Sequence, residues 1–238
     1  MHDNMPEFTA EEAIVALRQS WEVHTQAFGP ILEPAFVDDV PTRVTLIAAL
    51  NLISRREVKP GLEKLQSIKE KCQNRADWAA WLFFVGLCFE MAGIKDQMLK
   101  CYENAGEYGH GFYLPYLKLA KAAHSGGEFE KAETWYLKGI DCLKDADETV
   151  ILGSAYANYG SCLVSMGQLR EAEAALMESR KAVPELPGRT ATEAILYAFL
   201  GDKEKTEKCL ALLAKKEPQI YESTRQAVNE IFKCDNLG

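Results

Sequence analysis

The amino-acid sequence predicts an all-α protein, built as a solenoid of helix–turn–helix repeats with an additional helix covering each end. Three observations support this prediction: apolar residues recur at helical spacing, glycines mark tight turns between short segments, and equivalent positions return every 34 residues. Gly93 and Gly127 are 34 residues apart, and so are Gly167 and Gly201. Gly127 and Gly167 are instead 40 apart, so we expect an insertion of six residues, most simply within 144–150.

The composition argues against a nucleic-acid or membrane partner. Among the 238 residues, 27 Lys and Arg against 35 Asp and Glu give a net charge of −8, without a basic stripe that contains aromatic residues. The seven cysteines are odd in number and contain no CxxC pair, which favours a reduced, cytoplasmic protein. We find no secretory signal at the N-terminus, and the most apolar run, 78–89, is too short to span a bilayer.

The two ends of the chain are predicted to be helical caps. In residues 1–41, Thr9 and Glu12 form a capping-box pattern, and the helix that follows is expected to end at Gly29-Pro30. Residues 31–40 are interrupted by Pro34 and predict a turn or one short helix. Residues 219–238 predict a helix that covers the last repeat. Its apolar face comprises Ile220, Thr224, Ala227, Val228 and Ile231.

Five repeats are predicted between these caps. They span about 42–75, 77–110, 113–146, 153–186 and 187–218. The expected helices are 42–53 and 59–73, 77–91 and 94–108, 113–125 and 128–143, two in 153–184 around a turn at 166–168, then 189–200 and 203–215. Small residues are expected where the paired helices cross, because only Gly and Ala let two backbones approach closely. These residues are Gly86, Ala120, Ala132, Gly160, Ala172 and Ala194.

The unit at 153–184 resembles the tetratricopeptide repeat (TPR) family. It contains in order Tyr156, Tyr159-Gly160, Leu163, Gly167-Gln168-Leu169, Ala172, Leu176 and Pro184, and the third unit matches through Tyr116, Leu119-Ala120, Gly127-Glu128-Phe129, Ala132 and Tyr136. The first unit has no turn glycine at Arg55-Arg56-Glu57, and the second and fifth depart at Met98, Thr190, Glu193 and Thr206. The resemblance implies a right-handed α-solenoid whose first helices line a concave groove that binds peptides or partner helices.

The sequence contains no catalytic constellation. The four histidines do not pair with another His or Cys at metal-ligand spacing, and HExxH, GxSxG, P-loop and GxGxxG motifs are absent. We therefore predict a protein without enzymatic activity, cofactor or metal, which binds a peptide or partner protein. Two alternatives remain open at this point: a self-associating, homodimeric scaffold, and the regulatory subunit of an enzyme carried on another chain.

The resemblance also implies which residues would line the groove. From the N-terminal to the C-terminal side these are Phe83, Leu87, Glu90, Leu117, Lys118, Lys121, His124, Asn158, Ser161 and Thr192, together with Ala157, Ala191 and Ile195. Asn158 would hydrogen-bond a peptide backbone while Lys118 and Lys121 pair with its acidic groups; the alternative is a structural Asn158 and two solvated lysines. The helix around Phe83 is apolar on every side, so either segment 8–40 covers it or it forms a binding or dimerisation patch.

Overall fold

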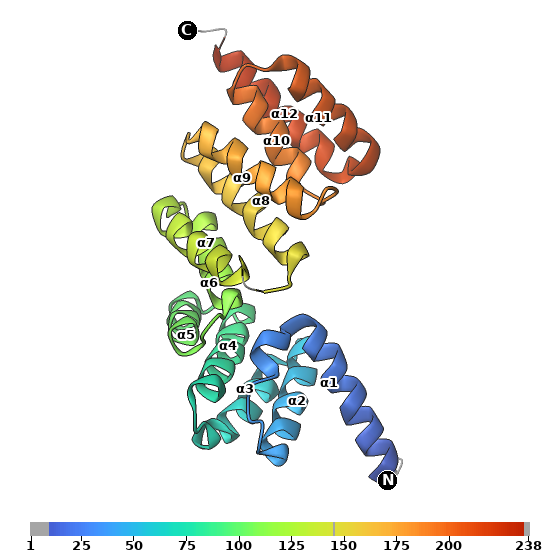
Figure 1. Ribbon diagram of the computed structural model, residues 1–238, viewed down its shortest axis with the longest axis vertical. Coiled ribbons are helices and arrows are strands. Elements are labelled where there is room, and N and C mark those ends of the chain that lie inside the picture. The colour runs from blue at the N-terminus through green and yellow to red at the C-terminus, as the bar shows by residue number, and fades with distance from the viewer. Residues whose placement is uncertain (1–9, 145, 236–238) are drawn as a thin grey trace. The chain divides into compact units, whose positions relative to one another are not determined.

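A computed structural model describes residues 10–144 and 146–235, and these residues form α-helices without a strand (Figure 1). The chain divides into two compact units, residues 1–115 and 116–238. The first contains α1 (Ala10–Leu32), α2 (Val40–Ser54), α3 (Val58–Ser67), a 3₁₀ helix (Lys69–Lys71), α4 (Arg75–Met91) and α5 (Lys95–Tyr108). Helix α6 (Tyr113–Ser125) begins just before the division. The second unit continues with α7 (Phe129–Lys144), α8 (Thr149–Ser165), α9 (Leu169–Ala182), α10 (Arg189–Phe199), α11 (Lys203–Lys216) and α12 (Pro218–Asp235). The all-α prediction is confirmed.

The five helical hairpins share one turn geometry. In each hairpin a backbone N–H donates to the carbonyl five residues earlier at 2.9 Å, which is the long hydrogen bond of a Schellman motif. The five bonds are Glu57 to Leu52, Ile94 to Phe89, Glu128 to Ala123, Gln168 to Leu163 and Asp202 to Tyr197. The residue before each donor has a left-handed backbone: Gly93 (φ 72°), Gly127 (75°), Gly167 (74°), Gly201 (72°) and, in the first hairpin, Arg56 (64°). The first turn therefore has the same shape as the others although it lacks glycine.

Close helix crossings explain the small residues of the pattern. A Cβ atom at Gly160 would lie 2.8 Å from Cγ of Leu176, and one at Gly86 would lie 2.9 Å from ring carbons of Tyr102. Ala172 is fully buried beside Leu176 in the same cluster. These contacts confirm the predicted crossings at Gly86, Gly160 and Ala172, because a larger residue would overlap its neighbour.

Two boundaries in the first unit differ from the prediction. Helix α1 does not end at Gly29-Pro30 but continues to Leu32 across a kink at Phe28 (φ −137°, ψ 23°); Pro30 is tolerated there because the kink starts a new first turn. Helix α3 ends at Ser67 rather than at residue 73. The chain must leave it early because Asn74 caps α4 through a reciprocal capping box with Asp77. The predicted capping box of Thr9 and Glu12 lies outside the part whose side chains are described.

A buried carboxylate fastens the N-terminal cap to α4. Asp77 is 3% exposed, and its Oδ1 accepts a hydrogen bond from the backbone N–H of Phe36 at 2.7 Å. Phe36 lies in the turn between α1 and α2. Arg43 of α2 contacts this turn as well: its Nε donates to the Ala35 carbonyl at 3.0 Å, and its guanidinium lies 4.5 Å from the centre of the Trp21 ring. The turn between α1 and α2 is thus held by two charged side chains rather than by apolar packing alone.

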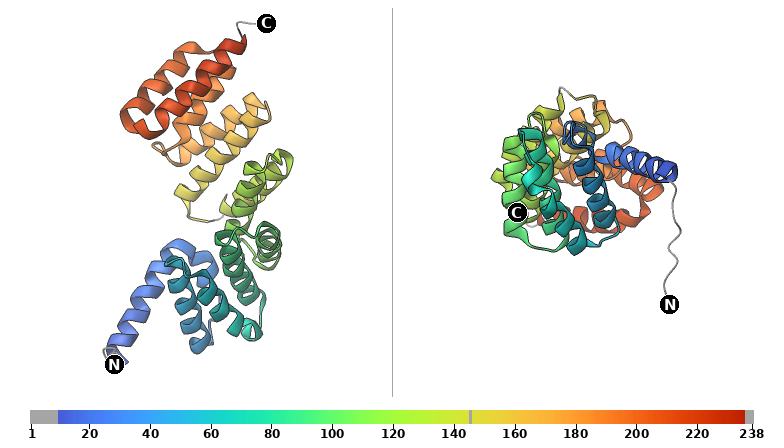
Figure 2. Two further views of the ribbon diagram at one scale, coloured as in Figure 1. Left: turned by 180° about the vertical axis from the view of Figure 1, so that it is seen from behind. Right: turned by 90° about the horizontal axis from the view of Figure 1, so that it is seen from below.

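The C-terminal helix covers the last hairpin as predicted. Val228 and Thr224 of α12 are buried, and Val228 belongs to one cluster with Ala194 and Ala198 of α10 and Leu213 of α11. The views in Figures 1 and 2 both show α12 alongside α10 and α11. The apolar side of the last hairpin is therefore filled by this helix.

Candidate partner-binding surfaces

The prediction that Phe83 lines a groove is wrong. Phe83 is 0% exposed, and its ring packs 6.0 Å from the Phe28 ring of α1 and 5.5 Å from the Tyr102 ring of α5. Helix α1, from the segment predicted to cover this apolar helix, thus packs on it through Phe28, and the patch proposed for dimerisation is removed. Nearby, Leu87 is half-buried, and Glu90 accepts a hydrogen bond from the Tyr102 hydroxyl at 2.5 Å. Helix α4 is apolar all round because neighbouring helices pack on more than one of its sides.

Three of the predicted residues occupy one position in successive repeats of the second unit. Lys118 of α6, Asn158 of α8 and Thr192 of α10 are separated by 40 and 34 residues, the spacings of the repeat turns. Asn158 is exposed, while Lys118 and Thr192 are half-buried. Lys121 and Ser161 form a second equivalent pair, with Lys121 exposed and Ser161 half-buried. We call these five residues the first-helix face.

Asn158 carries the exposed side-chain amide of this face. Its amide makes no hydrogen bond with any residue that the structure describes. Two serines of α8 differ, because the hydroxyl of Ser154 donates to the Val150 carbonyl at 2.9 Å and that of Ser165 donates to the Ser161 carbonyl at 3.1 Å. Helix α8 therefore satisfies these two serine hydroxyls internally and leaves the Asn158 amide available to a ligand.

Two other predicted residues have packing roles. His124 lies 5.8 Å from the Phe129 ring and 6.3 Å from the Tyr136 ring, and burial lowers the pKa of its imidazole. It is thus a neutral, packed side chain of the α6–α7 hairpin. Leu117 contributes to the same cluster, and its Cδ2 would lie 2.7 Å from a Cβ placed at Gly139. Neither observation indicates contact with a partner.

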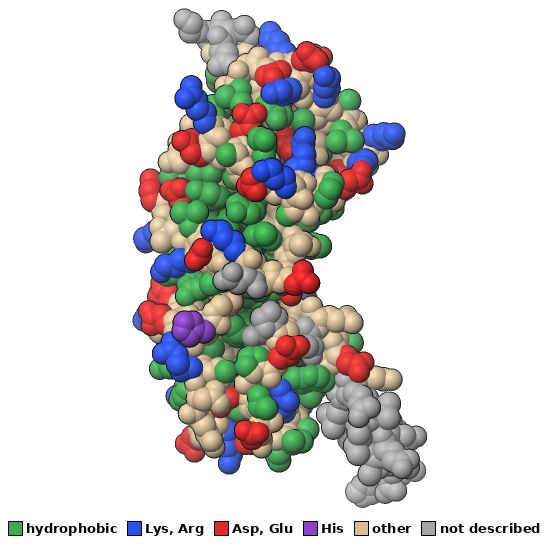
Figure 3. Space-filling view, in the orientation of Figure 1, with side chains coloured by type: hydrophobic (Ala, Val, Ile, Leu, Met, Phe, Trp, Pro, Cys, Tyr) green, Lys and Arg blue, Asp and Glu red, His purple; other side chains and the backbone are tan. Residues whose placement is uncertain are grey.

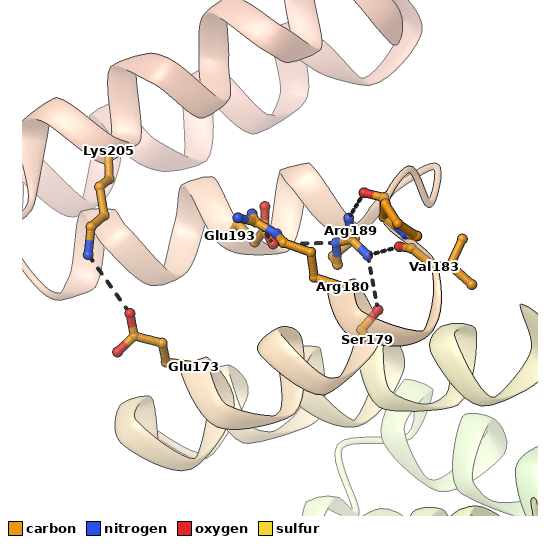
Figure 4. A network of polar contacts seen from close by, with 8 residues as sticks. Glu173, Ser179, Arg180, Val183, Arg189, Glu193 and Lys205 are labelled. Atoms are coloured by element: carbon orange, nitrogen blue, oxygen red, sulfur yellow. Dashed lines mark hydrogen bonds and ion pairs between the residues drawn. The ribbon is translucent and has the colours of Figure 1, made fainter. Parts of the chain in front are cut away.

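An ion-pair network in the fifth repeat was not predicted from the sequence (Figure 4). Arg189 is 4% exposed and donates to the carbonyls of Val183 and Pro184, both at 2.5 Å, and to the hydroxyl of Ser179 at 3.5 Å. Glu193 lies one turn further along α10 and accepts from Arg180 of α9 at 2.7 Å. The Glu193 carboxylate raises the pKa of Arg180. The network fixes the connection between α9 and α10.

This network forms one wall of a pocket of about 600 Å³. Its other walls include Leu186 and Leu212, and its rim includes Lys216, which pairs with Glu185 at 2.7 Å. The cations Arg180 and Lys216 are each matched by a glutamate of the pocket itself. Since the charges balance locally, the pocket shows no preference for an anion or a cation.

Reactive or metal-binding groups do not gather in the described part of the chain. Burial raises the pKa of the Cys88, Cys162 and Cys209 thiols to about 11, so these thiols stay protonated at neutral pH. Within residues 10–144 and 146–235, three His, Cys, Asp or Glu side chains never come together in an arrangement that would hold a metal. A helix with the length and apolar character needed to cross a membrane is also missing from these ranges.

The common Schellman turns, the 34-residue period and the small-residue crossings define the fold of a TPR protein. Solved structures agree. The chain resembles YrrB, described as a TPR protein with an unusual peptide-binding site, with a TM-score of 0.60 and 15% identity over 77% of this chain and 91% of that one. It also resembles BtubC from P. vanneervenii, with a TM-score of 0.59 and 16% identity over 90% and 92% of the two chains. A putative kinesin light chain from Podosopora anserina with TPR-like repeats has a TM-score of 0.52 and 12% identity over 81% and 96%.

Comparison of sequences gives a more distant relation. The chain is 24% identical over 206 residues to the "Protein CTR9 homolog" of Arabidopsis thaliana, which covers 82% of this chain but only 18% of that protein. The chain thus spans about a fifth of the length of this relative. No protein-family model matches the sequence. Together the comparisons establish the fold.

Proposed function

We propose that the protein is an interaction module whose second unit binds an extended peptide segment of a partner protein on the first-helix face. The observation that supports this most directly is the exposed Asn158 amide, which has no hydrogen-bond partner among the described residues. A side-chain amide presents two donors and an acceptor, and can pair with both the N–H and the C=O of one peptide residue. Lys118 and Lys121 favour a peptide that carries acidic side chains.

The surroundings of Asn158 suit the close approach of a peptide backbone. Its neighbours on α8 and α10 are small: Ala157 and Ser161 on its own helix, and Ala191 and Thr192 on the next. Because these side chains do not project far, the peptide can reach the Asn158 amide without displacing them. YrrB, whose fold this chain shares, is described as having a peptide-binding site. The net charge of −8 further supports a protein partner over nucleic acid, and cysteines that are free rather than paired in disulfides suit a cytoplasmic protein.

The test uses peptides selected on the full chain from a random display library. The affinity of the best peptide is then measured for the wild type and for the double variant Asn158→Ala, Lys121→Ala. We expect the double variant to bind about tenfold more weakly, because it loses the amide hydrogen bonds and one charge pair.

The matched control is Asn229→Ala, Lys215→Ala. It removes the same groups from exposed positions on α12 and α11, and should bind like the wild type. Undiminished affinity of the Asn158→Ala, Lys121→Ala variant, with peptides that still compete for one site, would refute the proposal.

A further inference from the structure

A second surface of the same unit has a different shape and charge. Between α8 and α9 lies a pocket of about 400 Å³. Its lining residues are Tyr156, Tyr159, Leu163, Glu171, Ala174, Ala175, Met177 and Glu178, and we call it the tyrosine pocket. Hydrophobic side chains are exposed over α8 and α9 on the face turned to the viewer in Figure 3. None of the five residues of the first-helix face lines this pocket, so the two surfaces are distinct.

The aromatic wall of the tyrosine pocket is held in place. The hydroxyl of Tyr159 donates to Oε1 of Glu133 on α7 at 2.9 Å, and its ring lies 6.2 Å from that of Tyr136. Burial raises the pKa of Tyr159, so the phenol stays neutral. The entrance, in contrast, is open: Met177 is 56% exposed, and Ala174 beside it is small and exposed.

Carboxylates surround this apolar hollow without enough cations to neutralise them. Glu178 pairs with Lys181 at 2.6 Å. Glu171 and Glu133 form no ion pair with any residue that the structure describes. A pocket with tyrosine rings inside and carboxylates without an ion-pair partner at its edge attracts cations and repels acidic groups. Its apolar lining can pack against the methylene groups that precede the charge of a long basic side chain.

We infer that the tyrosine pocket is a docking site for a basic segment of a partner protein, which inserts one arginine side chain. The aliphatic part of the arginine packs on the exposed Met177 and Ala174, and the planar guanidinium stacks on a tyrosine ring while it pairs with the Glu171 carboxylate. Arginine fits better than lysine because its flat, weakly hydrated cation both stacks and forms paired hydrogen bonds. The inference does not depend on the first-helix face, where the exposed cation Lys121 favours an acidic peptide instead.

The probe is a capped peptide of sequence Ala-Ala-Arg-Leu-Ala-Ala, titrated into the full chain with ¹³C-labelled Met and Ala methyl groups. We expect the Met177 and Ala174 methyl signals to shift. Replacing arginine with citrulline, which has nearly the same shape but no charge, should weaken binding by about fivefold. The exposed Glu171→Gln variant should weaken binding by a similar factor, whereas Glu103→Gln, the same change on an exposed face of α5, should have no effect.

Several outcomes would overturn the inference. One is a Met177 signal that stays in place at millimolar peptide, and another is equal affinity for the citrulline peptide. A third is normal arginine-peptide binding by Glu171→Gln. Shifts at Ala157 and Ala191 in place of Met177 would assign the peptide to the first-helix face. The Asn158→Ala variant separates the two proposals, because it should weaken the selected peptide and leave the arginine peptide unaffected.

Discussion

Arg56 occupies a backbone position that the other four hairpins give to glycine, so Arg56→Gly should stabilise the protein. An L-residue in the left-handed region costs about 1–2 kcal/mol, and glycine removes this strain. Glycine also makes the unfolded chain more flexible, which lowers the free energy of unfolding by about 0.4–1 kcal/mol. The exposed Arg56 side chain makes no hydrogen bond or ion pair with the described residues, so its loss adds nothing further. The net expectation is a stabilisation of about 0.5–1 kcal/mol.

Urea unfolding followed by circular dichroism measures this change. With a typical slope of about 2 kcal/mol per molar urea, the midpoint of the first unit should rise by about 0.4 M. The reciprocal variant is Gly167→Ala. A Cβ atom there would meet nothing within 4 Å, so its cost is backbone strain alone, and the midpoint should fall by a similar amount. A lower midpoint for Arg56→Gly, or an unchanged one for Gly167→Ala, would refute the equivalence of the five turns.

Three further predictions concern packing, reactivity and pH. Ala172→Leu should lower the melting temperature through about 1–3 kcal/mol of overpacking at a fully buried crossing, whereas Ala174→Leu, an exposed position on the same helix, should leave it nearly unchanged. The Cys162 thiol, whose pKa burial raises to about 11, should react with iodoacetamide far more slowly at pH 8 than exposed Cys234 does; mass spectrometry of the labelled peptides measures the ratio, and equal rates would contradict it. Hydrogen bonds from Thr42 lower the pKa of Asp39, so its cap on α2 contributes stability above the unfolded pKa and loses it as the pH falls. Asp39→Asn should therefore reduce the loss of stability between about pH 5 and pH 2, as measured by thermal unfolding at each pH.

The repeat architecture was predictable because it rests on local backbone demands. A turn glycine such as Gly167 needs a left-handed conformation, and a crossing residue such as Gly160 needs to be small. Each demand restricts the residue type at one sequence position, and that restricted position recurs with the repeat period. The first turn is predicted at Arg55-Arg56-Glu57 although it has no glycine, and the structure has Arg56 in the left-handed conformation there. Prediction failed where a position depends on a segment far away in the sequence.

Phe83 and Glu193 show this second case. Whether an apolar helix is a groove or a core depends on what covers it, and Phe28 lies 55 residues before Phe83. Glu193 breaks the repeat pattern, but its role requires Arg180 on the preceding helix as well as Arg189 one turn before it. The spacing of Arg189 and Glu193 by four residues was a visible sign of an ion pair on one helix face. It did not reveal that the pair is buried.

The positions that return in every repeat are used for folding, so recognition must rely on positions where the repeats differ. Departures of two kinds occur in the second unit. Glu193, which departs from the repeat pattern, belongs to the buried network that fixes the connection between α9 and α10, and little of its side chain faces solvent. At the position shared by Lys118, Asn158 and Thr192, the three side chains differ in charge and hydrogen bonding while the helices around them keep the same turns. A surface whose chemistry changes from repeat to repeat on an unchanged backbone can read a sequence of different residues along a bound segment. We therefore propose that specificity depends on the first-helix face as a whole more than on any single residue, Asn158 included.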